Sequence, residues 1–270
     1  MLEKESHNTL PAPKRKNGII EKIEYAKSEY QLLCSLIFGS YSPNGDPVQF
    51  VSQKAEGILS NARECFDHLW GDIFQAYIFD HLSVKEKQDY KSGSSRAVYF
   101  PMYISQMNKT KSVYRKILRK HHLDVFNFIY DFVEAIQKKK YIADTSFNAF
   151  YFRVIQEMVN EKKHSQVLQY SRGNSDQSFY YHESGSFLFD GDFKNDDPHI
   201  QIVFNENTNR RLVDSYYFTS NKRDVLKLCS FACHATAYVM DLFYDRIFSE
   251  TERKIVTPED IKITISDHHS

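Results

Sequence analysis

Residues 58 to 77 read ILSNARECFDHLWGDIFQAY, and they decide the fold because their apolar side chains recur at helical spacing. The apolar positions are Ile58, Ala62, Cys65, Leu69, Ile73 and Ala76. Steps of three or four residues are typical of an amphipathic helix that turns one face to a core. We therefore predict a helix that begins near Val48 or Val51 and runs to about Leu82, long enough to form the spine of a bundle.

The same helix carries Arg63 and His68, which are the first candidates for chemistry. An arginine can neutralise a phosphate with a planar fork of donors, and a histidine can move a proton near neutral pH. Together the two side chains could cleave RNA without a metal. They leave the helix roughly 140° apart, so a shared site needs either the long reach of Arg63 or a second copy of the helix across a two-fold axis. We therefore predict a homodimer.

Helical spacing recurs along most of the chain. The further predicted helices span residues 19 to 38, 109 to 122, 123 to 139, 145 to about 169 with Thr145 as the N-cap, and 225 to 248. A polar turn follows the long second helix, and residues 97 to 104 are then expected to be extended, because Pro101 forces Phe100 away from helical angles. These helices predict a bundle.

The pattern changes from helical to extended after Tyr170. Aromatic and β-branched residues are separated there by Gly, Asn and Asp, which is typical of antiparallel strands. The predicted strands span residues 178 to 189, 199 to 204 and 213 to 219. The predicted fold class is thus mainly α (α+β), with a small antiparallel sheet inserted before the last long helix. We expect a flexible leader over residues 1 to 18, one domain over residues 19 to 250 with the sheet insertion at about 178 to 219, and a C-terminal tail over residues 251 to 270.

The composition is that of a globular protein, with 270 residues, 41% hydrophobic and 26% charged. A formal net charge of zero argues against a protein that coats nucleic acid through bulk charge. We find neither a secretory signal nor a run long enough to span a membrane, so we expect a cytoplasmic protein without membrane contact. Cys34, Cys65, Cys229 and Cys233 have apolar neighbours on predicted helices, which predicts buried, reduced thiols and no disulfide.

One segment is strongly basic despite the neutral balance. No Asp or Glu occurs between Tyr90 and Leu123. The candidate nucleic-acid-binding residues in it are Lys109, Lys111, Arg115, Lys116, Arg119 and Lys120. Such a run can follow an RNA backbone, with Tyr114 available for stacking on a base. The alternative is an ordinary solvated helix face.

Patterns for metals and cofactors are weak. The acidic residues Asp190, Asp192, Asp196 and Asp197 lack the spacing and the final Glu of an EF-hand, and a polar hairpin turn explains them better. Cys229, Cys233 and His234 lack the second cysteine pair of a zinc site. Glycine-rich phosphate loops, nucleophile elbows and H-E-x-x-H helices do not occur in the sequence. We predict no cofactor and no metal.

Three short motifs, in the same order, resemble elements of a broad set of uncharacterised bacterial proteins. Residues 61 to 69, NARECFDHL, resemble an LRSALDHL helix; residues 99 to 102, YFPM, resemble an FPI element; and residues 160 to 164, NEKKH, resemble an N-x-DKH element. An Arg-x4-His helix in an α-helical bundle is also similar to the catalytic motif of the HEPN superfamily (higher eukaryotes and prokaryotes nucleotide-binding). Glu64 departs from it, because active members often carry Asn, Asp or His after the arginine.

This resemblance implies a metal-independent endoribonuclease, used as a toxin or antiviral effector, with RNA as substrate and an antitoxin or other protein as partner. Arg63 would hold the scissile phosphate and His68 would move the proton, leaving 2′,3′-cyclic phosphate ends. The supporting residues would be Asn61, Asp67, Asn160, Lys163 and His164. The alternative is a catalytically silent HEPN-like module that binds nucleotide or a partner protein, with Arg63 paired to Asp67 and His68 packed at the edge of the bundle.

Overall fold

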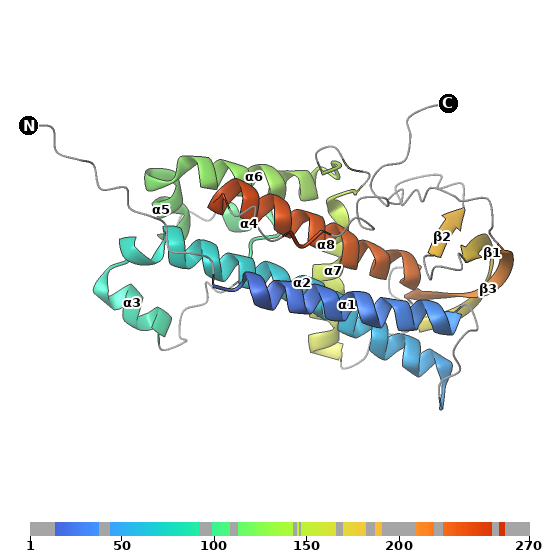
Figure 1. Cartoon of the computed structure of the whole chain (residues 1–270). Helices are drawn as coiled ribbons and strands as arrows, with labels where there is room; N and C mark the ends of the chain where they lie inside the picture. Colours follow the sequence, from blue (N-terminus) through green and yellow to red (C-terminus); the bar gives the residue numbers. More distant parts are fainter. Residues whose placement is uncertain are drawn as a thin grey trace, which may run out of the picture.

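The computed structural model describes residues 14–37, 44–91, 99–108, 113–142, 145, 147–165, 170–181, 187–190, 209–218, 224–249 and 254–256. These residues are mainly helical, which confirms the mainly α prediction. The helices are α1 (Lys16–Ile37), α2 (Pro47–Tyr77), the single 3-10 turn η1 (Phe79–His81), α3 (Val84–Lys91), α4 (Ile104–Met107), α5 (Val113–His121), α6 (Leu123–Gln137), α7 (Phe150–Ser165) and α8 (Val225–Phe248) (Figure 1). Within the described residues, no helix combines the length and the apolar character needed to cross a membrane.

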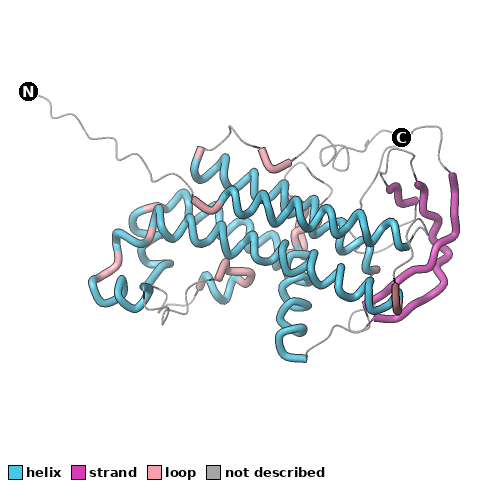
Figure 2. The backbone as a smooth tube through the Cα atoms, turned by 60° about the horizontal axis from the view of Figure 1, so that its bottom comes forward, coloured by secondary structure: helices cyan, strands magenta, loops and turns pink. Residues whose placement is uncertain are grey.

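The three longest helices, α1, α2 and α8, lie side by side along the molecule, and α7 runs across them (Figures 1 and 2). Helices α1 and α2 are antiparallel. Two ion pairs join them, from Lys22 to Glu64 and from Lys54 to Glu29, so a residue early in α1 meets one late in α2. The α1–α2 hairpin therefore fixes which side chains of α2 face α1.

Aromatic rings from five segments meet at the centre of the bundle. Phe66 of α2 lies 5.2 Å from Phe100, which precedes α4, and 5.0 Å from Phe152 of α7, measured between ring centroids. Phe132 of α6 and Phe243 of α8 complete the cluster, 5.1 Å apart and nearly perpendicular. Edge-to-face contacts of this kind are favourable for aromatic pairs. The cluster fixes α2 against α6, α7 and the segment before α4.

Three strands stand between α7 and α8: β1 (Tyr170–Tyr181), β2 (Phe187–Asp190) and β3 (Asn209–Phe218). They pair in the order β2-β1-β3, both pairs antiparallel, with Tyr180 opposite Leu188 and Ser171 opposite Tyr217. The sheet lies at the end of the bundle where α8 begins (Figure 1). A single strand over residues 178 to 189 is therefore wrong, because its two ends pair with each other; residues 199 to 204 lie outside the described residues.

The expected start of α7 at Thr145 is also wrong. The Thr145 hydroxyl donates to the Ile142 carbonyl at 2.9 Å and accepts from the Phe147 amide at 3.1 Å, so it closes a turn. Helix α7 begins at Phe150, whose amide donates to Asn148 Oδ1 at 3.0 Å. The asparagine thus satisfies an amide of the first helical turn.

The second helix ends at Tyr77 rather than near Leu82, and the polar turn expected after it contains α3. Ser83 starts α3 with a reciprocal cap: its amide donates to Glu86 Oε2 at 2.8 Å, and the Glu86 amide donates to Ser83 Oγ at 3.4 Å. Ser-x-x-Glu is a recognised helix-start signal, so the sequence held this helix and the prediction missed it.

A buried carboxylate, Asp72 of α2, anchors the start of the first helix. It accepts the amides of Lys14 and Arg15 at 3.3 and 3.1 Å and the hydroxyl of Tyr244 at 2.8 Å. Helix α1 begins at Lys16, directly after these amides. The leader boundary expected at residue 18 is therefore wrong, because residues 14 to 18 belong to the bundle.

A second buried carboxylate, Asp241 of α8, holds a segment beyond that helix. It accepts the Ile255 amide at 2.9 Å and the Val256 amide at 2.8 Å. The Ile255 side chain is itself buried in the core. Residues 255 and 256 are therefore part of the bundle, although the sequence placed them in a tail beginning at residue 251.

Candidate functional site

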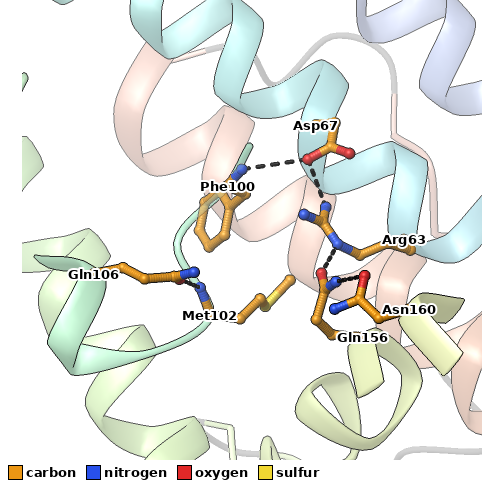
Figure 3. A network of polar contacts seen from close by, with 7 residues as sticks. All are labelled: Arg63, Asp67, Phe100, Met102, Gln106, Gln156 and Asn160. Atoms are coloured by element: carbon orange, nitrogen blue, oxygen red, sulfur yellow. Dashed lines mark hydrogen bonds and ion pairs between the residues drawn. The ribbon is translucent and has the colours of Figure 1, made fainter. Parts of the chain in front are cut away.

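The Arg63 side chain points into the protein, toward α7 (Figure 3). Only 6% of it is exposed. Its Nη1 donates to Asp67 Oδ1 at 2.6 Å, and its Nε donates to Gln156 Oε1. The guanidinium is therefore engaged from both sides by groups of its own chain.

The polar network around Arg63 joins the three motifs that carry the family resemblance (Figure 3). Asp67 also accepts the Phe100 amide at 3.3 Å, which ties α2 to the segment before α4. Gln156 donates from Nε2 to Asn160 Oδ1 at 2.8 Å along α7. Buried polar groups must be hydrogen-bonded to avoid a desolvation cost, and this network meets that need for Arg63. The arrangement suits a structural role.

The same network continues to the start of α4. Gln106 Oε1 accepts the Met102 amide at 2.8 Å and the Tyr103 amide at 3.2 Å (Figure 3). These bonds hold the chain after Pro101 in its extended course, as the proline predicts. The polar contacts thus fix the loop that carries Phe100 into the aromatic core.

His68 lies on the other side of α2, against the first turn of α1. A Cβ atom on Gly18 would sit 3.5 Å from both Cε1 and Nδ1 of the imidazole. Burial, and then the positive charges of Lys22 and Arg15, lower the pKa of His68 below its ordinary value. Its Nδ1 is buried and has no hydrogen-bond partner among the residues that the structure describes. The imidazole is thus held in its neutral form in the α1–α2 seam.

Arg63 and His68 therefore face different neighbours and do not form a common pocket. The angle of roughly 140° expected from helix geometry is matched by their contacts, with α7 for Arg63 and with α1 for His68. A second copy of the chain would not bring them together, because Arg63 is nearly inaccessible from outside. The alternative in which Arg63 pairs with Asp67 is confirmed.

The supporting residues do not gather around His68 either. Asn61 donates to the Gly57 carbonyl at 2.9 Å, a bond within its own helix. Asp67 and Asn160 belong to the Arg63 network. The side chains of Lys163 and His164 lie outside the described part of α7. Gln156 was missed, because no spacing in the sequence links it to an arginine 93 positions earlier.

The basic segment is partly visible as α5. Lys116, Arg119 and Lys120 are exposed, and no ion pair involves them within the residues described. Their spacing of three and four residues places them on neighbouring positions of the helix surface. Arg115 donates from Nη1 to the Asn108 carbonyl at 2.8 Å, while Lys109, Lys111 and the Tyr114 side chain lie outside the described residues.

The four cysteines are buried and carry free thiols, in the positions that their apolar neighbours predict. Burial raises the pKa of Cys65 to about 12 and that of Cys34 and Cys229 well above its ordinary value. A thiol that stays protonated is a poor nucleophile and a poor metal ligand. The cysteines therefore act as small apolar core residues.

Comparisons with known proteins add no relative: no family model, no curated protein and no solved structure matches the chain.

Proposed function

We propose that this protein is a catalytically silent, HEPN-like helical module that binds RNA along α5. The observation that supports silence is the burial of Arg63. An arginine that holds a scissile phosphate needs donors that face a solvent-accessible site. Arg63 instead directs Nε and Nη1 to Gln156 and Asp67 inside the bundle. It stabilises the packing of α2 against α7.

The HEPN character of the fold is part of this proposal. Its support is the resemblance of three motifs, together with the contact between them: Asp67, Phe100 and Asn160 belong to one polar network. In this proposal the sheet of β1, β2 and β3 is an insertion into the bundle between α7 and α8. The protein acts through surfaces on the helices rather than through an Arg–His pocket.

RNA binding is supported by the charge of α5. Lys116, Arg119 and Lys120 are exposed cations on a helix with no acid in its first turn and with basic residues in its last. A cluster of cations on a neutral protein gives a local rather than a global attraction for phosphates. Each phosphate neutralised by such a residue releases counterions, so the affinity must fall as salt rises.

The test of RNA binding uses fluorescence anisotropy with a labelled single-stranded RNA at several salt concentrations. The variant Lys116→Glu with Arg119→Glu should bind more weakly and should lower the slope of log affinity against log salt by about two. The matched control is Lys138→Glu with Lys140→Glu, which makes the same charge change on exposed side chains after α6. Equal losses in both variants would reduce the effect to net charge and reject α5 as the RNA-binding surface.

Silence is tested separately, by incubating the purified protein with RNA in EDTA and analysing the strand ends. We expect the same background cleavage from wild type and from His68→Ala purified in parallel. Products with 2′,3′-cyclic ends that appear with wild type and disappear with His68→Ala would establish a ribonuclease and refute silence. Binding by α5 and cleavage by His68 are independent outcomes, so either half of the proposal can fail alone.

A further inference from the structure

Three histidines that are distant in sequence meet at one end of the bundle. His81 ends η1, His121 ends α5, and His122 links α5 to α6. Nε2 of His81 lies 3.4 Å from Nε2 of His122. The rings of His81 and His121 stack with centroids 4.2 Å apart and an interplanar angle of 16°. Two of the three imidazoles thus present the same nitrogen to each other.

The separation of the two Nε2 atoms matches the spacing of ligands around a metal ion. Zinc binds imidazole nitrogen at about 2.0–2.1 Å in tetrahedral geometry, which places two ligand nitrogens roughly 3.3–3.4 Å apart. We propose that His81 and His122 bind a Zn²⁺ ion through their Nε2 atoms. Among the described residues no three His, Cys, Asp or Glu side chains already converge for a metal, so water completes the coordination.

Neighbouring rings hold both imidazoles in place. The His122 ring lies 5.0 Å from the ring of Tyr77, whose hydroxyl donates to the Ile247 carbonyl at 2.5 Å. His81 is held by stacking on His121. Ligands whose orientation is fixed by their surroundings bind a metal with less loss of entropy.

The surrounding charges set the expected strength. Arg119 and Lys120 stand in the last turn of α5, next to the histidines, and oppose a divalent cation. With two protein ligands and these cations, the site should bind more weakly than a four-ligand structural zinc site. An ion at this position would join η1 to the α5–α6 junction, two segments whose histidines are 41 residues apart.

Isothermal titration of the full chain, without a histidine tag, with ZnCl₂ tests the assignment. We expect one ion per chain, and affinity weakened at least about tenfold in His81→Gln and in His122→Gln. The control His268→Gln with His269→Gln removes the other adjacent histidine pair, which lies outside the described residues, and should leave the site intact. His121→Phe keeps a stacked ring without a metal-binding nitrogen and should bind within about threefold of wild type.

A second readout does not depend on comparing affinities. Electron paramagnetic resonance of the protein with one equivalent of Cu²⁺ should show two imidazole nitrogens in wild type and one in His81→Gln. Titration curves that are the same for wild type and the double variant His81→Gln, His122→Gln would overturn the proposal, as would fewer than two nitrogens in wild type. Loss of binding in His121→Phe would replace the two-histidine assignment.

Discussion

Arg63→Ala removes a guanidinium that is 6% exposed and leaves its two partners, Asp67 and Gln156, without it. Removing one member of a buried ion pair costs about 3–5 kcal/mol. Asp67 remains 25% exposed and still accepts the Phe100 amide, so part of its desolvation cost is already met. We therefore expect the lower end of that range, about 3 kcal/mol in the free energy of unfolding.

Urea denaturation followed by circular dichroism measures this cost. The midpoint should fall while the slope of unfolding free energy against urea stays constant, because the substitution changes stability rather than the surface exposed. In a domain of this size, about 3 kcal/mol corresponds to a melting temperature lowered by roughly 6–12 °C. The background cleavage of RNA should not change, because Arg63 does not reach solvent.

The matched control replaces both charges, as Arg63→Met with Asp67→Asn. Its loss should be smaller than the sum of the single losses, by a coupling energy of about 0.5–3 kcal/mol. An Arg63→Ala protein within about 0.5 kcal/mol of wild type would show that the pair does not hold the bundle. Loss of an RNA-cleaving activity at unchanged stability would refute the structural role altogether.

Three further predictions concern residues of α2. His68 has a lowered pKa in the folded protein, so the unfolded chain takes up the proton more readily and stability falls as the pH drops below about 6.5; His68→Gln should flatten this decrease in urea midpoints between about pH 7 and about pH 5, and an unchanged slope would contradict it. Phe66→Ala removes the ring that contacts Phe100 and Phe152 and should cost about 3–5 kcal/mol in urea unfolding, against a much smaller loss for Phe66→Leu; similar losses would argue against the aromatic cluster. Asp72→Ala leaves buried donors unpaired and should cost about 2–3 kcal/mol; faster amide exchange at Lys14 and Arg15 would locate the cost there, and unchanged exchange would count against it.

The sequence predicted the parts of the fold that depend on periodicity. The buried stripe of α2, with Ile58, Leu69 and Ile73 fully buried, follows from steps of three and four residues. The divergence of Arg63 and His68 follows from the same helix geometry. The pairing of Arg63 with Asp67 is local as well, since side chains four residues apart on a helix are neighbours.

What the sequence could not supply were contacts between distant segments. The Gln156 amide carries no charge and no motif, and only the packing of α7 on α2 makes it a partner of Arg63. The meeting of His81 with His122 likewise depends on how η1 folds back on the α5–α6 junction. Such contacts decide whether a motif is catalytic or structural, so an Arg-x4-His spacing alone does not assign an enzyme.

The carboxylate of Asp241 has a practical consequence for handling this protein. Its two amide partners, Ile255 and Val256, come after the last helix, so the smallest unit expected to fold extends to residue 256. A fluorescent reporter or affinity label fused directly after Phe248 would displace those amides and leave an anion facing apolar neighbours. Joined beyond residue 256, the same fusion would leave the amides in place, and the two versions would differ in expression yield and protease resistance.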